Sequence, residues 1–312
     1  MKMTTPSLSI MLRTFAAEDP HGWQRVIDCA RAADVAGIDR VLVSDHVVFG
    51  ENLDAYSRPE SGGVEGGRQP TGPDGHWLEP LTVLTYVAAL TSSVRLGTNI
   101  LLAALRRPVV LAKTVATLDV LSGGRVDLGV GIGWQREEYE AAGLDFGERG
   151  RLLDDTLEVL REFWTAPRAS LDLPSLRFEG IHMMPKPLQA GGVPLWISGR
   201  LNDRVAGRLA RYGSGWIPWG DDAADPVAGI PRMREAVAKA GGDATALRVA
   251  GTLTMVRRGD KSIDLDATMA GVGPLADAGV TDFQVHLVIP EDYDDAVASL
   301  QEAVGSFRAA SQ

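Results

Sequence analysis

A run of alternating glycines is the first sign of chemistry in this chain. In RVDLGVGIGWQREEYE (125–140), Gly129, Gly131 and Gly133 follow an apolar stretch. Glycines of this kind let a ligand approach the backbone closely. The dinucleotide fingerprint G-x-G-x-x-G needs a glycine where this chain has Trp134, and its acidic residue about 20 positions on would fall inside an expected helix. The run therefore predicts a ligand-binding loop other than a dinucleotide fingerprint.

His46 is the candidate for proton transfer. It follows Ser44 and Asp45 directly after the apolar stretch RVLV. A histidine at the end of a strand can take or give a proton near neutral pH. The same pattern fits a structural histidine bonded to a neighbouring loop, and the local sequence does not separate these two hypotheses.

A second candidate site follows the apolar run VPLWI. Ser198, Gly199 and Arg200 come next, and Asn202 is placed to cap the following helix. Backbone N–H groups at a helix start, together with a nearby arginine, form a favourable phosphate site. An ordinary capped helix with a solvated arginine is the alternative.

Other catalytic patterns are missing from the sequence. It contains no HExxH, no cluster of Cys and His, no GxSxG elbow and no GxxxxGK[ST] loop. Asp45 and His46 are adjacent, which is not the spacing of facial metal ligands. We therefore expect no metal site.

The candidate residues lie at the ends of short apolar runs that alternate with helical patterns. Eight such runs occur, at 7–14, 40–46, 94–102, 125–132, 193–199, 215–220, 247–256 and 282–289. Alternation predicts a parallel sheet, and eight units in one chain of this length favour a closed (β/α)₈ TIM barrel as a single domain over 1–312. An open doubly wound sheet is the alternative. In a barrel, the ends of the runs meet at one face, where chemistry is expected.

Two segments are longer than ordinary connections. Residues 47–77, rich in Gly and Pro, follow the second predicted strand, so we expect them on the active face as a substrate lid, with a disordered excursion as the alternative. Residues 165–192 form an insertion before the fifth strand and suggest a short strand and a Pro-fixed turn.

Composition and charge exclude several classes of function. The chain has 312 residues and a net charge of −10, which gives it no overall attraction for nucleic acid or anionic membranes. No apolar stretch reaches the length of a membrane span, and the first residues lack the apolar core of a signal peptide. Cys29, the single cysteine, is expected to be a buried apolar filler. A cytoplasmic protein that acts on a small molecule is the expectation.

Several longer segments resemble the luciferase-like monooxygenase superfamily, and most closely its branch of coenzyme F420-dependent oxidoreductases. They are GIDRVLVSDH, EPLTVLTYVAALTSSVRLGTNIL, the stretch from RRPVVLAKTVATL to GIGWQREEYEAAGLDFGERGRLLDDTLEVL, and VPLWISGRLNDRVAGRLARYGSGW. The resemblance implies a TIM barrel with a flavin-type ring in its mouth and a phosphate tail directed toward the end of strand 5. It also implies a cis peptide bond between Asn99 and Ile100, and a homodimer whose interface uses helices near strands 2 to 4.

The same resemblance assigns roles to individual residues. His46 matches the histidine that handles the substrate proton in the sugar-phosphate dehydrogenase of this branch. The cofactor-binding residues it implies are Asp45, Asn99, Ile100, Gly131, Gly133, Trp134, Ser198, Gly199 and Arg200. Trp134 replaces the glutamate that follows the glycine run in that dehydrogenase, which makes sugar-phosphate oxidation by its mechanism doubtful. Glu137 and Glu138, one turn further on, are expected to face solvent or the start of the helix, and the alternative is that one of them substitutes for that glutamate.

The predicted activity is hydride transfer between coenzyme F420 and an apolar or ring-bearing substrate. Two alternatives remain open. One is a monooxygenase that uses reduced FMN from a partner reductase, and the other is a non-catalytic flavin-binding barrel. The sequence does not choose among them, because the same residues would serve all three.

Overall fold

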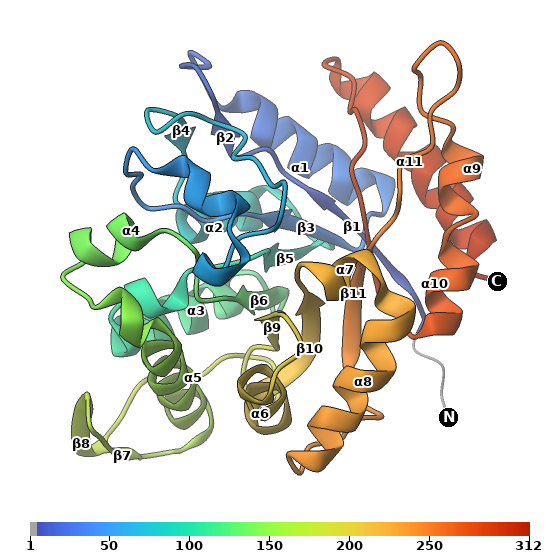
Figure 1. Cartoon of the computed structure of the whole chain (residues 1–312). Helices are drawn as coiled ribbons and strands as arrows, with labels where there is room; N and C mark the ends of the chain where they lie inside the picture. The colour runs from blue at the N-terminus through green and yellow to red at the C-terminus, as the bar shows by residue number, and fades with distance from the viewer. Residues whose placement is uncertain (1–4) are drawn as a thin grey trace.

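Eight parallel strands close into a barrel in the computed structural model, which describes residues 5–312 (Figure 1). Their order around the barrel is β1-β12-β11-β10-β9-β6-β5-β3, and β3 pairs with both β1 and β5. The predicted TIM barrel is thus confirmed, and the open sheet is excluded. The barrel strands are β1 (Ser7–Met11), β3 (Arg40–Val43), β5 (Arg95–Thr98), β6 (Val126–Val130), β9 (Leu195–Gly199), β10 (Gly213–Pro218), β11 (Arg248–Thr252) and β12 (Asp282–Val285).

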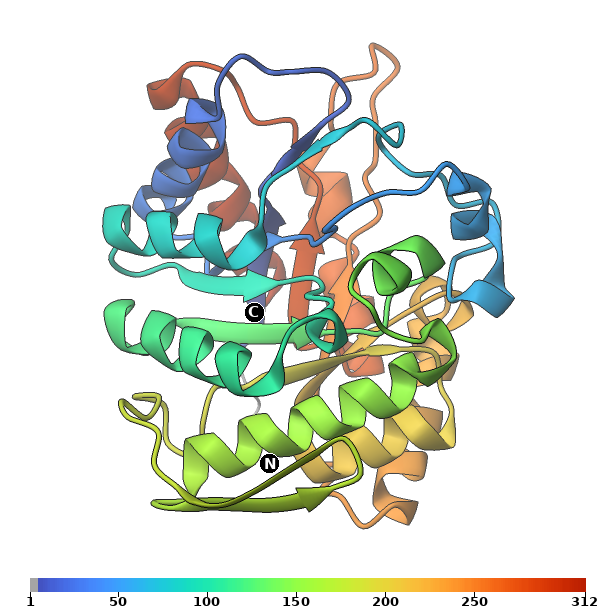
Figure 2. The ribbon, with the colours of Figure 1, turned by 90° about the vertical axis from the view of Figure 1, so that its left-hand side faces the viewer.

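Helices surround the barrel and bury their apolar faces against it. On α5, Leu153, Leu157, Leu160 and Trp164 are all buried, as their helical spacing predicts. Figure 2 shows α2, α3 and α5 packed along one side of the barrel. The helices are α1 (Gln24–Ala36), α2 (Pro80–Leu90), α3 (Pro108–Leu121), α4 (Arg136–Ala141), α5 (Arg149–Thr165), α6 (Asp203–Tyr212), α7 (Asp221–Ala224), α8 (Pro226–Lys239), α9 (Leu265–Met269), α10 (Val272–Ala278) and α11 (Tyr293–Ala310). Within residues 5–312, none of them has the length and hydropathy needed to cross a membrane.

A buried ion-pair network fills the end of the barrel at which the strands begin. Arg40 Nε donates to Asp127 Oδ2 at 2.7 Å, and Arg40 Nη2 lies 3.2 Å from Asp282 Oδ1. The guanidinium of Arg40 also stacks over the Trp196 ring, 4.8 Å from its centroid. Burial acts to raise the pKa of Asp127, but Arg40 and Arg95 outweigh it and hold that pKa below its ordinary value. This end of the barrel is therefore a packed structural floor.

The two long segments occupy different places. Residues 47–77, which we call the covering segment, lie over the end of the barrel where the strands finish (Figure 1). They carry two short 3₁₀ turns, Leu53–Ser57 and Pro59–Ser61, and end in β4 (His76–Trp77), which pairs with β2 (Phe15–Ala16). The predicted location on the active face is confirmed. The insertion 165–192 forms a hairpin of β7 (Ala169–Leu173) and β8 (Leu176–Ile181), which packs on α5 away from the mouth.

The third barrel strand is shorter than its apolar run predicts. The run extends over 94–102, whereas β5 ends at Thr98. The bond between Asn99 and Ile100 is a cis peptide, as the family resemblance implied. The chain then turns into a short bridge between Leu101 and Val130.

Candidate functional site

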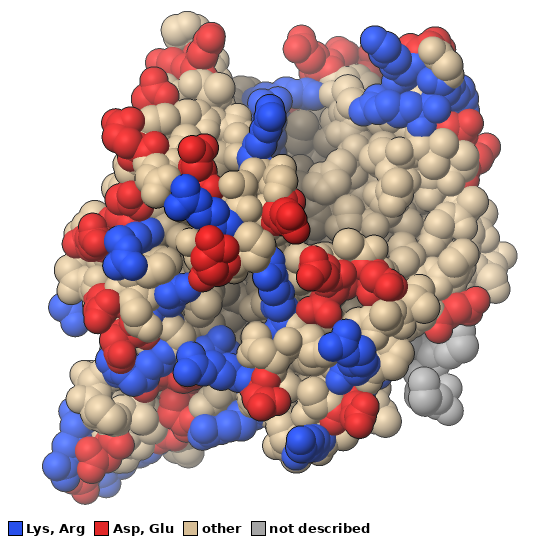
Figure 3. Space-filling view, in the orientation of Figure 1, with Lys and Arg blue, Asp and Glu red and all other residues tan. Residues whose placement is uncertain are grey.

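A cavity of about 390 Å³ opens at the barrel mouth, between the strand ends and the covering segment. Figure 3 shows the molecule hollowed on this face. Among the described residues that line the cavity, Asp45 is the only one with a carboxylate, ammonium or guanidinium group. These residues are Met11, Phe15, Ser44, Asp45, His46, Tyr56, Gly62, Gln69, Pro70, Trp77, Asn99, Ile100, Leu102, Gly131, Ile132, Gly133, Trp134, Ser198, Gly199, Trp219 and His286.

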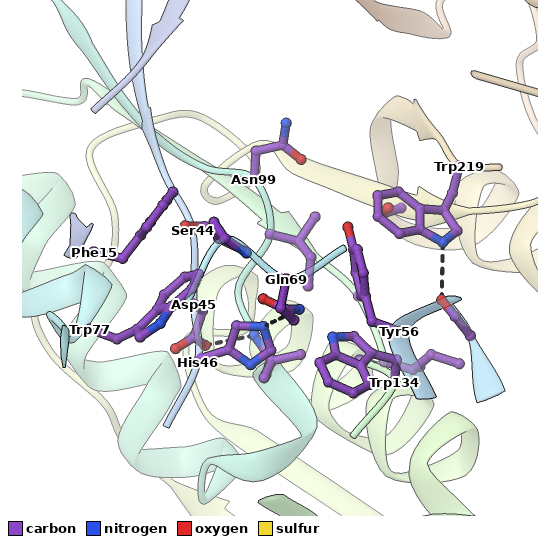
Figure 4. Close-up of a pocket in the computed structure, with 18 of the residues that line it drawn as sticks. Phe15, Ser44, Asp45, His46, Tyr56, Gln69, Trp77, Asn99, Trp134 and Trp219 are labelled. Carbon is purple, nitrogen blue, oxygen red and sulfur yellow. Dashed lines mark hydrogen bonds between the residues drawn. The ribbon is translucent and has the colours of Figure 1, made fainter. Parts of the chain in front are cut away.

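His46 lies in the cavity wall, held between a carboxylate and aromatic rings. Its Nδ1 atom is 3.2 Å from Glu138 Oε1, and its side chain is 10% exposed. The ring centroids of Trp77 and Trp134 lie 4.8 and 5.8 Å from that of the imidazole, both roughly perpendicular to it (Figure 4). His46 was predicted to point into the mouth beside the glycine run, and its side chain does line the cavity together with Gly131 and Gly133.

Glu138 lies at the start of a helix, as expected, but its side chain does not face solvent. It lies in the first turn of α4 with a fully buried side chain, and its Oε1 also accepts from the Val47 N–H at 2.8 Å. Its second oxygen, Oε2, has no partner among residues 5–312. Glu137 is half-buried, as the solvent-facing expectation allows. Its neighbour Tyr139 is also buried, and the Tyr139 hydroxyl donates to the Ile132 carbonyl at 2.6 Å.

Asp45 is hydrogen-bonded to groups of the protein itself. Its Oδ2 accepts from the Leu102 N–H at 2.8 Å and from Arg106 Nη1 at 2.6 Å, and its Oδ1 lies 3.2 Å from Arg106 Nη2. The carboxylate therefore fastens the segment that follows the cis peptide bond. Asp45 remains in the wall of the cavity, but protein donors already occupy both of its oxygens.

The glycine run and the cis peptide bond together form one side of the cavity. A Cβ on Gly131 would come within 2.9 Å of Ile100 Cδ1, and one on Gly133, where φ is +68°, would come within 2.7 Å of Leu102. Side chains at these positions would fill the wall. Asn99 projects from the same turn and donates from Nδ2 to Gln284 Oε1 at 3.0 Å. These residues form a flat, backbone-lined surface suited to a planar ring.

The predicted phosphate segment divides between two roles. Ser198 and Gly199 line the cavity, and Asn202 caps α6 by accepting from the Val205 N–H at 3.0 Å. Arg200 does not line the cavity. Its Nη2 donates to the Gly63 carbonyl at 3.0 Å, so that it holds the covering segment to the barrel.

Sequence reasoning missed several residues of the cavity, most of them from the covering segment or from connections that follow strands. Tyr56, Trp77 and Trp219 provide aromatic walls, and Gln69 reaches His46 from the covering segment. His286, at the end of β12, is a second histidine in the wall, and burial lowers its pKa below the ordinary value. The described residues include no group of three or more His, Cys, Asp and Glu that could hold a metal ion.

The chain matches known proteins over most of its length. A family model described as luciferase-like monooxygenase matches residues 7–269. An uncharacterised protein of Mycobacterium tuberculosis is 36% identical over 152 residues, which are 48% of this chain and 54% of that protein. An F420-dependent glucose-6-phosphate dehydrogenase of Nocardia farcinica is 31% identical over 239 residues, which are 72% of this chain and 62% of the relative. These two alignments thus span between half and two thirds of the relatives' lengths.

The fold has a counterpart among solved structures. The structure of an F420-dependent secondary alcohol dehydrogenase in complex with an F420-acetone adduct superposes with a TM-score of 0.73. The two chains are 17% identical, and the alignment covers 97% of this chain and 99% of the other. At that identity the likeness establishes the fold alone.

Proposed function

Since this chain belongs to the luciferase-like monooxygenase family, we propose that it transfers a hydride between coenzyme F420 and an uncharged, apolar or ring-bearing organic substrate. The family match alone supports an oxidoreductase of the luciferase-like kind. The finer proposal is supported by the relative named as F420-dependent and by the composition of the cavity.

The residues of the cavity fit a deazaflavin ring. Gly131 and Gly133 line the cavity without side chains of their own and pack closely on Ile100 and Leu102, so this wall would present backbone to a planar group. Ser198 and Gly199 lie in the same wall and would hold the part of the cofactor that leads to its phosphate. When bound, coenzyme F420 supplies two-electron hydride chemistry.

His46 is the residue that would exchange a proton with the substrate. Its Nδ1 faces Glu138 Oε1, and a carboxylate accepts hydrogen bonds only, so Nδ1 carries a hydrogen. In the neutral imidazole, Nε2 is then the basic nitrogen. The buried carboxylate would also stabilise the imidazolium that forms when Nε2 takes a proton. This pair is the single observation that carries the catalytic part of the proposal.

The cavity does not suit a phosphorylated substrate. No Lys or Arg of residues 5–312 lines it, and Arg200 is bonded to the covering segment. Trp134 stands directly after the glycine run and contributes an apolar wall. Burying an unpaired phosphate beside aromatic rings would be strongly unfavourable. We therefore propose a neutral substrate with an apolar body.

A titration of the purified protein with oxidised F420, and separately with FMN, tests the cofactor. We expect F420 to bind more tightly than FMN, and Gly131→Val to weaken F420 binding at least tenfold by filling the wall beside Ile100. Gly207→Ala on α6, where an added Cβ meets no atom within 4 Å, is the matched control and should bind F420 normally. Preferential binding of FMN, with oxygen consumption once it is reduced, would replace this proposal by the monooxygenase alternative.

A further inference from the structure

A glutamine of the covering segment contacts the histidine of the proposed chemistry. Nε2 of Gln69 lies 3.5 Å from Nε2 of His46, and both side chains line the cavity (Figure 4). The other end of the same amide, Oε1, is buried and has no hydrogen-bond partner among residues 5–312. Apart from the contact with His46, the described residues provide this amide with no hydrogen-bond partner, so it is available to a polar group that a ligand brings.

The hydrogen on Nδ1 of His46 determines what Gln69 can do. Because Glu138 accepts from Nδ1, the neutral ring presents a bare lone pair at Nε2. The NH₂ end of the Gln69 amide is then the end that faces His46 as a donor. A substrate hydroxyl that gives its hydrogen to Nε2 takes over this contact, and the displaced amide N–H is left beside the hydroxyl oxygen.

We propose that Gln69 is a specificity-determining residue that binds, together with His46, the hydroxyl or carbonyl oxygen of an uncharged organic substrate. This inference rests on the proposed function for the identification of that ligand as the substrate. A hydroxyl donates to Nε2 of His46 and accepts from the Gln69 amide, whereas a carbonyl accepts from the amide alone. Gln69 thereby distinguishes an oxygenated compound from a hydrocarbon of the same shape.

The surroundings of Gln69 agree with a neutral polar ligand group. Oγ of Ser44, which also lines the cavity, is a second buried polar atom with no partner among the described residues. The carboxylate of Asp45 is already bonded to Arg106 and Leu102. Ser44, His46 and Gln69 therefore form a polar patch between Trp77 on one side and Tyr56 and Trp219 on the other (Figure 4), and these aromatic rings would hold an apolar body. Among the described residues that line the cavity, no charged side chain is left free to bind an ion.

The position of Gln69 depends on how the covering segment is attached. Trp219 Nε1 donates to the Gly62 carbonyl at 3.0 Å, and Arg200 holds Gly63. On the other side, Trp77 Nε1 donates to Thr71 Oγ1 at 3.0 Å. The first two contacts tie the segment before Gln69 to the barrel, and the third fixes the segment after it to β4, which pairs with β2. Together they determine the position of Gln69.

The proposal is tested with pairs of ligands of similar shape, in which a hydroxyl group of one replaces a methyl group of the other. The probes are cyclohexanol with methylcyclohexane, and 1-phenylethanol with isopropylbenzene, each titrated calorimetrically against wild type, Gln69→Leu and Arg68→Ala. We expect the ratio of the alcohol Kd to the hydrocarbon Kd to rise roughly three- to tenfold in Gln69→Leu, the loss of about one hydrogen bond. Arg68 is the exposed neighbour, and its variant should keep the wild-type ratio.

A ligand-free measurement accompanies the titrations. In ¹⁵N spectra of the imidazole groups, Gln69→Leu should move Nε2 of His46 toward the shift of a nitrogen without a hydrogen bond, with the thermal unfolding midpoint unchanged. An unchanged Kd ratio in Gln69→Leu for both pairs would overturn the proposal. So would a wild-type protein that binds neither alcohol up to its solubility limit.

The experiments can refute the proposed function and the role of Gln69 independently of each other. If F420 does not bind but the alcohol preference and its dependence on Gln69 remain, the cofactor assignment is wrong and the role of Gln69 stands. If F420 binds and Gln69→Leu leaves the alcohol preference unchanged, the role of Gln69 is wrong and the function stands.

Discussion

Nδ1 of His46 lies 3.2 Å from Oε1 of Glu138, a residue 92 positions further along the chain. The carboxylate belongs to the first turn of α4, and the histidine follows β3. Because the carboxylate can only accept, this contact selects one tautomer of the histidine and directs its basic nitrogen toward the cavity.

The first prediction concerns His46 itself. His46→Ala should retain the fold and the affinity for the cofactor but lower the turnover number by roughly 10²–10⁴-fold, the usual contribution of a positioned proton-transfer group. Single-turnover hydride transfer and cofactor titration on the same purified variant are the measurements. Wild-type turnover in this variant would refute the catalytic role, and lost stability with normal activity per folded molecule would make His46 structural.

Glu138 should act as a positioning residue. In Glu138→Gln the amide can donate to Nδ1, so we expect the ¹⁵N spectrum of His46 to show a mixture of tautomers and turnover to fall roughly 10- to 10²-fold, part of the contribution of His46. Glu137→Gln, the half-buried neighbour, is the control and should change neither quantity. A lower turnover with an unaltered tautomer would show that Glu138 acts by some other route.

Asp45 should be required for stability. Its side chain is fully buried, so Asp45→Ala leaves the Leu102 N–H without an acceptor and Arg106 with only its partly exposed partner Glu79. The free energy of unfolding should fall by about 3 kcal/mol. Denaturant unfolding measures this loss. Asp172→Ala, which breaks the exposed pair with Arg177, is the control and should cost less than about 1 kcal/mol. If Asp45→Ala instead unfolds normally and loses only cofactor affinity, the carboxylate is a cofactor ligand.

The floor of the barrel should make the protein sensitive to acid. The pKa of Asp127 is lower in the folded chain than in the unfolded chain, so in the intervening pH range the unfolded chain binds more protons. The stabilisation is complete above the unfolded value of about 3.9 and is lost as the pH falls through the folded value. Asp127→Asn should therefore flatten the dependence of unfolding free energy on pH below about pH 5. An unchanged slope in this variant would contradict the assignment.

We propose that two copies of the chain associate through α2 and α3. Large apolar side chains on these helices are exposed to solvent, namely Tyr86, Leu90, Val110 and Leu121. Tyr86→Glu combined with Val110→Glu should convert a dimer to a monomer in sedimentation at micromolar concentration, because a charge in an apolar interface is costly. Val227→Glu on α8, also exposed, should leave the dimer intact. A monomeric wild-type protein would remove this proposal.

The sequence determined the barrel and the location of its active face. The spacing of apolar residues along each segment indicates whether it is a strand or a helix. Eight alternating strands and helices can pack in few ways, of which the closed barrel is the most common. For the same reason His46 and the run Gly131-x-Gly133 could be placed at the mouth, because each directly follows a strand. The cis peptide bond at Asn99 came from the family resemblance, since no periodic pattern encodes it.

Only the tertiary structure decided which polar groups meet. Glu138, Gln69 and Arg200 lie in loops or at helix starts, and their partners are 92, 23 and 137 residues away. Periodicity records whether a side chain is buried, but it carries no information on which distant loop supplies the partner of a buried charge. Glu138 was therefore expected in solvent or at the helix start, and its contact with His46 follows only from the packing of α4 at the barrel mouth. The role of Arg200 at a phosphate stays a prediction, and the tertiary structure adds its hydrogen bond to the covering segment.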